Sequence, residues 1–147
     1  MEQDLVVAFI GSYPPRACGI ATFTQDLSEA VARSGRNIAT RIAAINDEGA
    51  TYLYPPQVRW TVDQYDPQSW KNVAHQINRS RISLVSVQHE FGIFGKFDRA
   101  GAFIDHLAGF LDHIENQWLL PYIRSFRTRV RTNERPFAVF MIVVLRW

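Results

Sequence analysis

The chain has 147 residues, of which 47% are apolar and 20% are charged, and its formal net charge is +2. This composition is that of a globular protein and excludes an intrinsically disordered chain, while the small net charge does not by itself indicate nucleic-acid binding. The single cysteine, Cys18, excludes an internal disulfide and is typical of a reducing compartment, so we expect a cytoplasmic protein. No apolar run approaches the roughly 18 residues of a transmembrane helix. The acidic start of the chain does not resemble a secretory signal.

The two ends of the chain differ in character. All eight glycines and all four histidines lie before residue 117, whereas residues 117–147 contain arginines and a single acid, Glu134. One domain rarely changes composition so abruptly. We therefore divide the chain into a domain of residues 1–116 and an atypical basic and apolar tail of residues 117–147.

The first third of the chain predicts a strand, a helix and a second strand. Residues 5–10 form a continuous apolar run that ends at Gly11, which is typical of a strand buried on both faces. Apolar residues then recur at helical spacing and predict a helix closed by Gly35. Residues 38–45 indicate the next strand. The residues expected on the buried face of the helix are Ile20, Phe23, Leu27 and Val31.

The rest of the domain continues the alternation. A short extended piece at residues 58–60 precedes Asp66-Pro67, an N-cap followed by proline, which predicts a helix with Trp70 and Ile77 on its buried face. Residues 82–87 predict a strand, and residues 102–114 predict a helix. Alternating strands and helices favour an α/β fold, a Rossmann-like three-layer arrangement with a parallel sheet between helices. Residues predicted to face inward are Val73 and Ala74 in the middle helix and Phe103, Leu107, Phe110 and Leu111 in the last.

The loop after the first strand is the first candidate site. Free N–H groups at the start of the following helix favour an anion such as a phosphate. Gly19 and Ile20 begin that helix, Gly11 ends the strand, and Arg16 offers a charged donor. Neither the dinucleotide fingerprint nor a P-loop is present. The alternative is a connection stiffened by two prolines, and Cys18 has no neighbouring base that would favour a nucleophile.

The second candidate site follows the strand of residues 82–87. His89 and Glu90 stand at the end of this strand, where ligands bind in parallel α/β sheets, and Gly92 and Gly95 follow in the loop. His89 suits acid–base chemistry. Ile93 stands where a zinc protease would need its second histidine. The alternative is a polar pair that caps a strand above packed aromatic residues.

The other histidines indicate no metal site. His106 and His113 share one helix face, which we expect to be a surface stripe because further ligands are not evident. His75 is expected on a solvated helix face. The predicted set of metal ligands is therefore empty.

Two segments, Ser12 to Leu27 and Val87 to Gly95, resemble the amino-terminal domain of bacterial retaining glycosyltransferases of the GT-B type, glycosyltransferase family four. The resemblance covers about residues 4–115. It implies half of an enzyme with two Rossmann-like domains that face a cleft. The amino-terminal domain mostly binds the acceptor, and the carboxy-terminal domain holds the nucleotide-sugar and carries a Glu-x7-Glu motif.

The resemblance also implies the reaction and the role of each site residue. The full enzyme would transfer a sugar, with retention, from a nucleoside diphosphate sugar to a carbohydrate or lipid-linked acceptor, without a metal or a resident cofactor. Gly19 and its neighbours Gly11, Arg16 and Ile20 would lie near the donor phosphates. His89 would be catalytic on the acceptor side. Glu90, Gly92 and Gly95 would bind the acceptor.

The chain departs from this family after Asn116. It lacks a second domain and has no two glutamates eight positions apart, so we expect the chain alone to be inactive. Residues 117–127 can be encoded by a DNA string that, in a shifted frame, gives Val-Thr-Thr-Leu-His-Thr, a continuation usual in the family. Our hypothesis is that a frameshift truncated the front half of a two-domain enzyme. The downstream DNA sequence tests it.

Other interpretations of the chain stay open. It could be a non-catalytic module that binds a sugar or nucleotide or completes a partner, rather than half of an enzyme. Residues 137–145 could form a buried strand, a partner surface or an aggregation-prone segment. Our leading interpretation has no nucleic-acid partner, but arginines of the tail could bind nucleic acid or associate peripherally with anionic lipid. These arginines are Arg124, Arg127, Arg129 and Arg131.

Overall fold

A five-stranded sheet forms the centre of the computed structural model, which describes residues 5–90, 92–97, 99, 103–114 and 140–145. The strand order is β3-β2-β1-β4-β7. The first four strands are parallel, as predicted, and β7 pairs antiparallel with β4. Residues 140–145, part of the segment for which a buried strand was one interpretation, form a strand. The strands are β1 (Leu5–Gly11), β2 (Ile38–Asn46), β3 (Val58–Asp63), β4 (Leu84–His89) and β7 (Phe140–Leu145).

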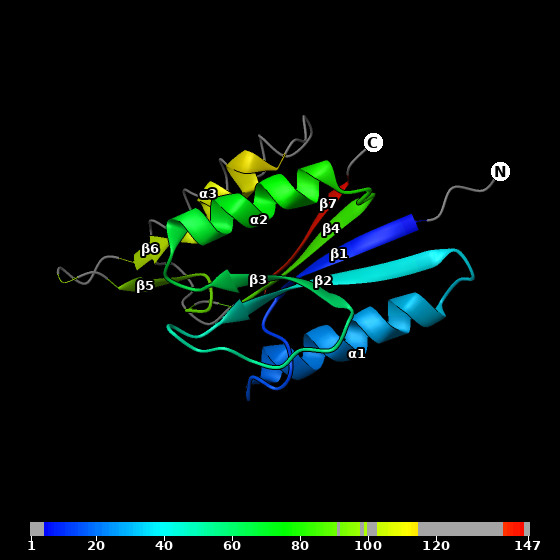
Figure 1. Ribbon diagram of the computed structural model, residues 1–147, viewed down its shortest axis with the longest axis horizontal. Helices are drawn as coiled ribbons and strands as arrows, with labels where there is room; N and C mark the ends of the chain where they lie inside the picture. The colour runs from blue at the N-terminus through cyan, green and yellow to red at the C-terminus, as the bar shows by residue number, and fades with distance from the viewer. Residues whose placement is uncertain (1–4, 91, 98, 100–102, 115–139, 146–147) are drawn as a thin grey trace.

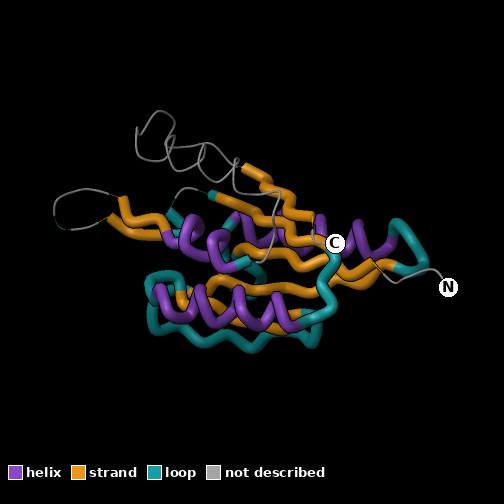
Figure 2. The backbone as a smooth tube through the Cα atoms, turned by 90° about the horizontal axis from the view of Figure 1, so that it is seen from above, coloured by secondary structure: helices purple, strands orange, loops and turns teal. Residues whose placement is uncertain are grey.

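Helices cover both faces of this sheet and make three layers (Figure 1). Helix α1 lies on one face, and α2 and α3 lie on the other. A short antiparallel hairpin, β5–β6, extends past the carboxyl ends of the parallel strands (Figure 2). The order and layering are those of a Rossmann-like α/β fold. The bounds are α1 (Gly19–Arg33), α2 (Pro67–Arg79), α3 (His106–His113), β5 (Gly95–Phe97) and β6 (Phe103–Asp105).

Helix α2 begins where its local signals predict. The Asp66 side chain accepts a hydrogen bond from the Gln68 N–H at 2.9 Å, and Pro67 is the first helical residue. The four apolar residues predicted to face inward are all buried in the core between α2, α3 and the sheet. These residues are Trp70, Val73, Ala74 and Ile77.

The face that α1 presents to the sheet differs from the prediction. Phe23 is 47% exposed, while Thr24 and Ser28 are buried. Small side chains face the sheet because α1 approaches β1 closely: a Cβ atom added to Gly11 would lie 3.0 Å from Thr24 Oγ1. A phenylalanine has no room in this contact, so the buried face is rotated away from Phe23. Ile20 is buried, and Leu27 and Val31 are partly buried, as expected.

The last helix also begins later than predicted. Residues 103–105 form β6, and α3 starts at His106, whose N–H donates to the Phe94 carbonyl at 2.8 Å. Ala102 lies outside the described residues. Leu107, Phe110 and Leu111 are buried, as the helical pattern predicts. No helix within the described residues is long and apolar enough to cross a membrane.

Candidate functional site

The carboxyl ends of β1 and β4 lie side by side at one edge of the sheet. Ile10 of β1 is in register with Val87 of β4, so the loops that follow these strands start next to each other. From β1 the chain passes through α1 to β2 on one side, while β4 lies on the other side. This reversal of strand order is where ligands bind in open α/β sheets. The fold therefore brings the two sequence-predicted loops to the same edge.

Arg16 is anchored in the loop after β1 by four polar contacts. Its Nη1 donates to Ser12 Oγ at 3.2 Å and to the Ile45 carbonyl at 3.0 Å. Its Nη2 donates to Gln64 Oε1 at 3.0 Å and lies 2.6 Å from Asp47 Oδ1. The side chain is only 12% exposed. These contacts engage the four terminal N–H groups of the guanidinium and leave Nε–H as its remaining donor.

Gln64, which was not among the predicted site residues, connects the two candidate loops. Its Oε1 accepts from Arg16, and its Nε2 donates to the Gly92 carbonyl in the loop after β4. Its own carbonyl accepts from Trp70 Nε1 at 3.1 Å. The side chain is 4% exposed. Its position directly after β3 could have indicated a site residue. The extended segment was predicted to end at residue 60, however, whereas β3 continues to Asp63.

Two tyrosines hold the end of β2 beside Arg16. Tyr52 donates to Asp47 Oδ2 and Tyr54 donates to Asn46 Oδ1, each at 2.7 Å. The hydrogen bond to Asp47 raises the pKa of Tyr52, and burial raises the pKa of Tyr54 to about 12. Both phenols are therefore neutral donors at neutral pH, and Tyr52 and Arg16 contact different oxygens of Asp47.

The amino end of α1 offers free backbone donors at this edge. Cys18 is the N-cap residue but makes no side-chain cap, and the Ala21 N–H donates to the Cys18 carbonyl at 3.1 Å. The N–H groups of Gly19 and Ile20 have no hydrogen-bond partner among the described residues. A Cβ atom added to Gly19 would meet nothing within 4 Å. Gly19 is thus exposed and open to the approach of an anion.

His89 occupies a buried position at the end of β4. It is 1% exposed, and its ring lies against Phe94 with centroids 4.9 Å apart. Burial lowers the pKa of His89 to about 4, so the imidazole is neutral at neutral pH. The neighbouring Gln88 faces α1, close to Gly11, and its buried Oε1 has no hydrogen-bond partner among the described residues.

The other predicted residues of the second loop take different positions. Glu90 is half-buried, and its carbonyl accepts from the Ile93 N–H at 3.2 Å. Gly92 is exposed and has a φ of 97°, a conformation that favours glycine. Gly95 is buried and begins β5. The structure therefore exposes Gly92 at the edge and uses Gly95 inside the hairpin.

The histidines of α3 do not form the expected surface stripe. His106 is buried, with 8% exposure, because it starts the helix against Phe94. His113 is half-buried, and its ring contacts that of His75, which is exposed as predicted, at 5.6 Å. Across the described ranges, no group of three His, Cys, Asp or Glu residues could hold a metal ion. The tail arginines at positions 124, 127, 129 and 131 lie outside the described residues.

Comparisons with models of protein families, with curated proteins and with solved structures found no match. The Rossmann-like α/β fold follows from the strand order and the helices on both faces of the sheet.

Proposed function

We propose that the chain is the acceptor-side domain of a retaining sugar transferase of the GT-B type. One observation carries this proposal: the two segments that resemble the family meet at the carboxyl edge, where Gln64 joins Arg16 of the first loop to Gly92 of the second. In the proposed enzyme, this edge faces the nucleoside diphosphate sugar and a carbohydrate or lipid-linked acceptor.

The donor diphosphate lies at the amino end of α1 in this proposal. The N–H groups of Gly19 and Ile20 point along the helix axis toward the edge and supply two donors for phosphate oxygens. Arg16 acts mainly by holding the loop, because its terminal N–H groups already have partners.

The acceptor lies beside the loop after β4. With a pKa of about 4, His89 is neutral near pH 7 and acts as a hydrogen-bonding partner of an acceptor hydroxyl rather than as a charged acid. Glu90 supplies a carboxylate for sugar hydroxyls, and Gly92 leaves room for the ring. His89 is buried, so binding of the acceptor requires the loop to open above it.

Catalysis needs groups beyond this edge. Departure of a nucleoside diphosphate requires preorganised charge around the leaving phosphates. The sequence contains no two glutamates with the family's spacing, and Gly19 and Ile20 alone offer neutral donors. We therefore expect the chain by itself to bind sugar nucleotides weakly and to transfer no sugar.

A titration with a transfer assay tests this proposal. The purified chain is titrated calorimetrically with UDP-glucose and GDP-mannose, and the same samples are assayed for released nucleoside diphosphate. Saturable binding that inorganic pyrophosphate weakens, without turnover, is the expected result. If neither compound binds saturably, the proposed donor site is wrong. Turnover above the blank would contradict the expected inactivity.

A further inference from the structure

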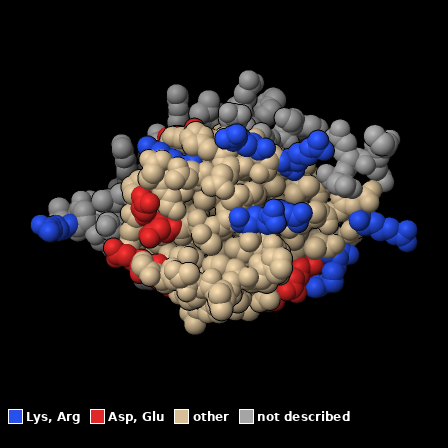
Figure 3. Space-filling view, viewed as in Figure 1, with Lys and Arg blue, Asp and Glu red and all other residues tan. Residues whose placement is uncertain are grey.

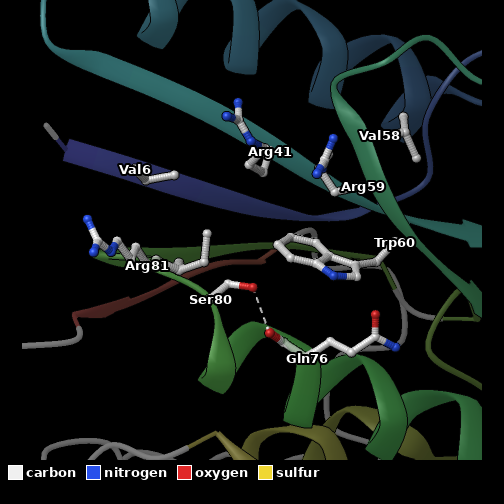
Figure 4. Close-up of a pocket in the computed structure, with 9 residues that line it drawn as sticks. Val6, Arg41, Val58, Arg59, Trp60, Gln76, Ser80 and Arg81 are labelled. Carbon is white, nitrogen blue, oxygen red and sulfur yellow. Dashed lines mark hydrogen bonds between the residues drawn. The ribbon is translucent and has the colours of Figure 1, made fainter.

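A pocket lies at the amino end of the parallel sheet, opposite the carboxyl edge. It has a volume of about 590 Å³ and lies between the end of α2 and the first residues of β1, β2 and β3 (Figure 4). Ligand sites of proteins span roughly 300–1,000 Å³. The pocket shares no residue with the carboxyl edge described above. It is therefore a separate site, independent of the proposed function.

Three arginines from three different elements line this pocket. Arg41 belongs to β2, Arg59 to β3, and Arg81 to the connection between α2 and β4. Arg41 Nη1 donates to the Thr40 carbonyl at 2.8 Å, and none of the three forms an ion pair within the described part of the chain. No acidic residue is among the described residues that line the pocket. Like charges so placed repel one another, and a bound anion relieves this repulsion.

The surface around the pocket has the same sign. Figure 3 shows basic side chains gathered over the upper middle and right of this face, with acidic side chains toward its left and lower margins. The carboxyl end of α2, whose dipole disfavours an anion, is capped: Ser80 Oγ donates to the Gln76 carbonyl at 2.7 Å. The helix end carries about half an elementary charge, which three guanidinium groups outweigh.

Trp60 gives the pocket an aromatic surface. Its indole extends across the middle of the pocket, between Arg59 and Gln76 (Figure 4). The side chain is half-buried and packs against the core, so its position is fixed before any ligand binds. A fixed aromatic face beside arginines suits a flat ring linked to a phosphate.

We propose that this pocket binds a nucleotide, with its phosphates on the arginines and its base on Trp60. Arg59 and Arg81 are exposed, so their guanidinium groups are accessible to the phosphates. Arg41 is half-buried and supplies a third positive charge. The binding of pyrophosphate alone depends on the arginines, and the additional affinity of a nucleotide depends on Trp60.

The arginine arm of the test uses the full chain with ADP and inorganic pyrophosphate as probes. Calorimetric titrations compare the wild type with Arg59→Gln/Arg81→Gln and with the control Arg33→Gln/Arg36→Gln, which removes two exposed charges elsewhere. Loss of two charged hydrogen-bond donors is expected to lower the affinity for both ADP and pyrophosphate by at least about tenfold. The control is expected to change affinity less than twofold in buffer with salt. Equal affinities in the two double variants, or no saturable binding to the wild type, would overturn the proposal.

The aromatic arm separates a nucleotide site from a simple anion site and from the carboxyl edge. Trp60→Leu is expected to lower the affinity for ADP several-fold and to leave the affinity for pyrophosphate unchanged. The unchanged affinity for pyrophosphate also shows that the variant is folded. Equal binding of ADP by Trp60→Leu and the wild type would overturn the role of the base. If Gly19→Ala weakens ADP while Arg59→Gln/Arg81→Gln does not, the nucleotide binds at the carboxyl edge and this proposal is wrong.

Discussion

Arg16 donates to Gln64 Oε1 at 3.0 Å, and the same amide group of Gln64 donates through Nε2 to the carbonyl of Gly92. One buried side chain therefore fixes the spacing between the loop after β1 and the loop after β4. Because a buried polar network is favourable only when its members are all partnered, the carboxyl edge is held in place as a unit. The donor side of the site is thus built before any ligand arrives, whereas the buried His89 on the acceptor side becomes accessible only when the loop after β4 opens.

Replacement of Gln64 by leucine is expected to destabilise the fold. Gln64→Leu leaves the Gly92 carbonyl and one N–H group of Arg16 without their partners, at a cost of about 1–3 kcal/mol in the free energy of unfolding. Chemical denaturation measures this difference. The control Gln68→Leu, on the exposed side of α2, is expected to stay within about 0.5 kcal/mol. Similar values for the two variants would contradict the bridging role.

Replacement of Gly19 separates ligand binding from stability. A Cβ atom at this position meets nothing within 4 Å, and alanine is the better helix former, so Gly19→Ala should leave stability unchanged or raise it by up to about 1 kcal/mol. The added methyl group stands where a phosphate would approach, and weaker binding of UDP-glucose is expected. Thermal unfolding and calorimetry measure the two effects. A stable variant with unchanged affinity for UDP-glucose would show that the donor does not bind at the amino end of α1.

Gly11 is required by close packing. In Gly11→Ala the new Cβ atom lies 3.0 Å from both Gln88 Cβ and Thr24 Oγ1, so these two side chains must give way by a few tenths of an ångström. We expect a loss of about 1–3 kcal/mol in the free energy of unfolding, as for other overpacked cores. Gly109→Ala is the matched control, because its Cβ atom meets nothing within 4 Å, and it should stabilise α3 by about 0.5–1 kcal/mol. The two substitutions are expected to change the free energy of unfolding in opposite directions. Changes of the same sign would contradict the close packing at Gly11.

His89 makes the stability of the fold depend on pH. Its pKa is about 4 in the folded chain and near 6.5 when unfolded, so between these values the unfolded state binds more protons. Stability is therefore fully present above about pH 6.5 and is lost as the pH falls toward 4, by roughly 3 kcal/mol at most. Denaturation at several pH values should show a smaller slope for His89→Phe than for the wild type. The exposed His75→Gln should keep the wild-type slope, and a wild-type slope in His89→Phe would refute the assignment.

Local signals sufficed for some elements. The Asp66 cap, Pro67 and the apolar spacing of α2 all lie within one segment, and the structure places that helix and its buried face as predicted. The alternation of strands and helices likewise predicted the parallel sheet. The loops after β1 and β4 were predicted to lie at one edge because ligands bind at the carboxyl ends of the strands in open α/β sheets.

Other features depend on contacts between distant segments. Phe23 is exposed because α1 approaches β1 at Gly11. Residues 103–105 form the strand β6 rather than a helical turn because they pair with β5. Gln64 acquires its role from partners 48 and 28 residues away in the chain. The burial of His89 beneath Phe94, which sets its pKa, depends on how the loop after β4 folds back. No local pattern encodes these contacts.

The proposed function requires the amino end of α1 to bind the phosphates of a nucleoside diphosphate sugar. Amide NMR of the 16.9 kDa chain during titration with UDP-glucose tests this claim directly. We expect saturable shifts of the Gly19 and Ile20 N–H signals and no shift at Gly35, at the other end of α1. Saturable binding that leaves Gly19 and Ile20 unmoved would contradict it.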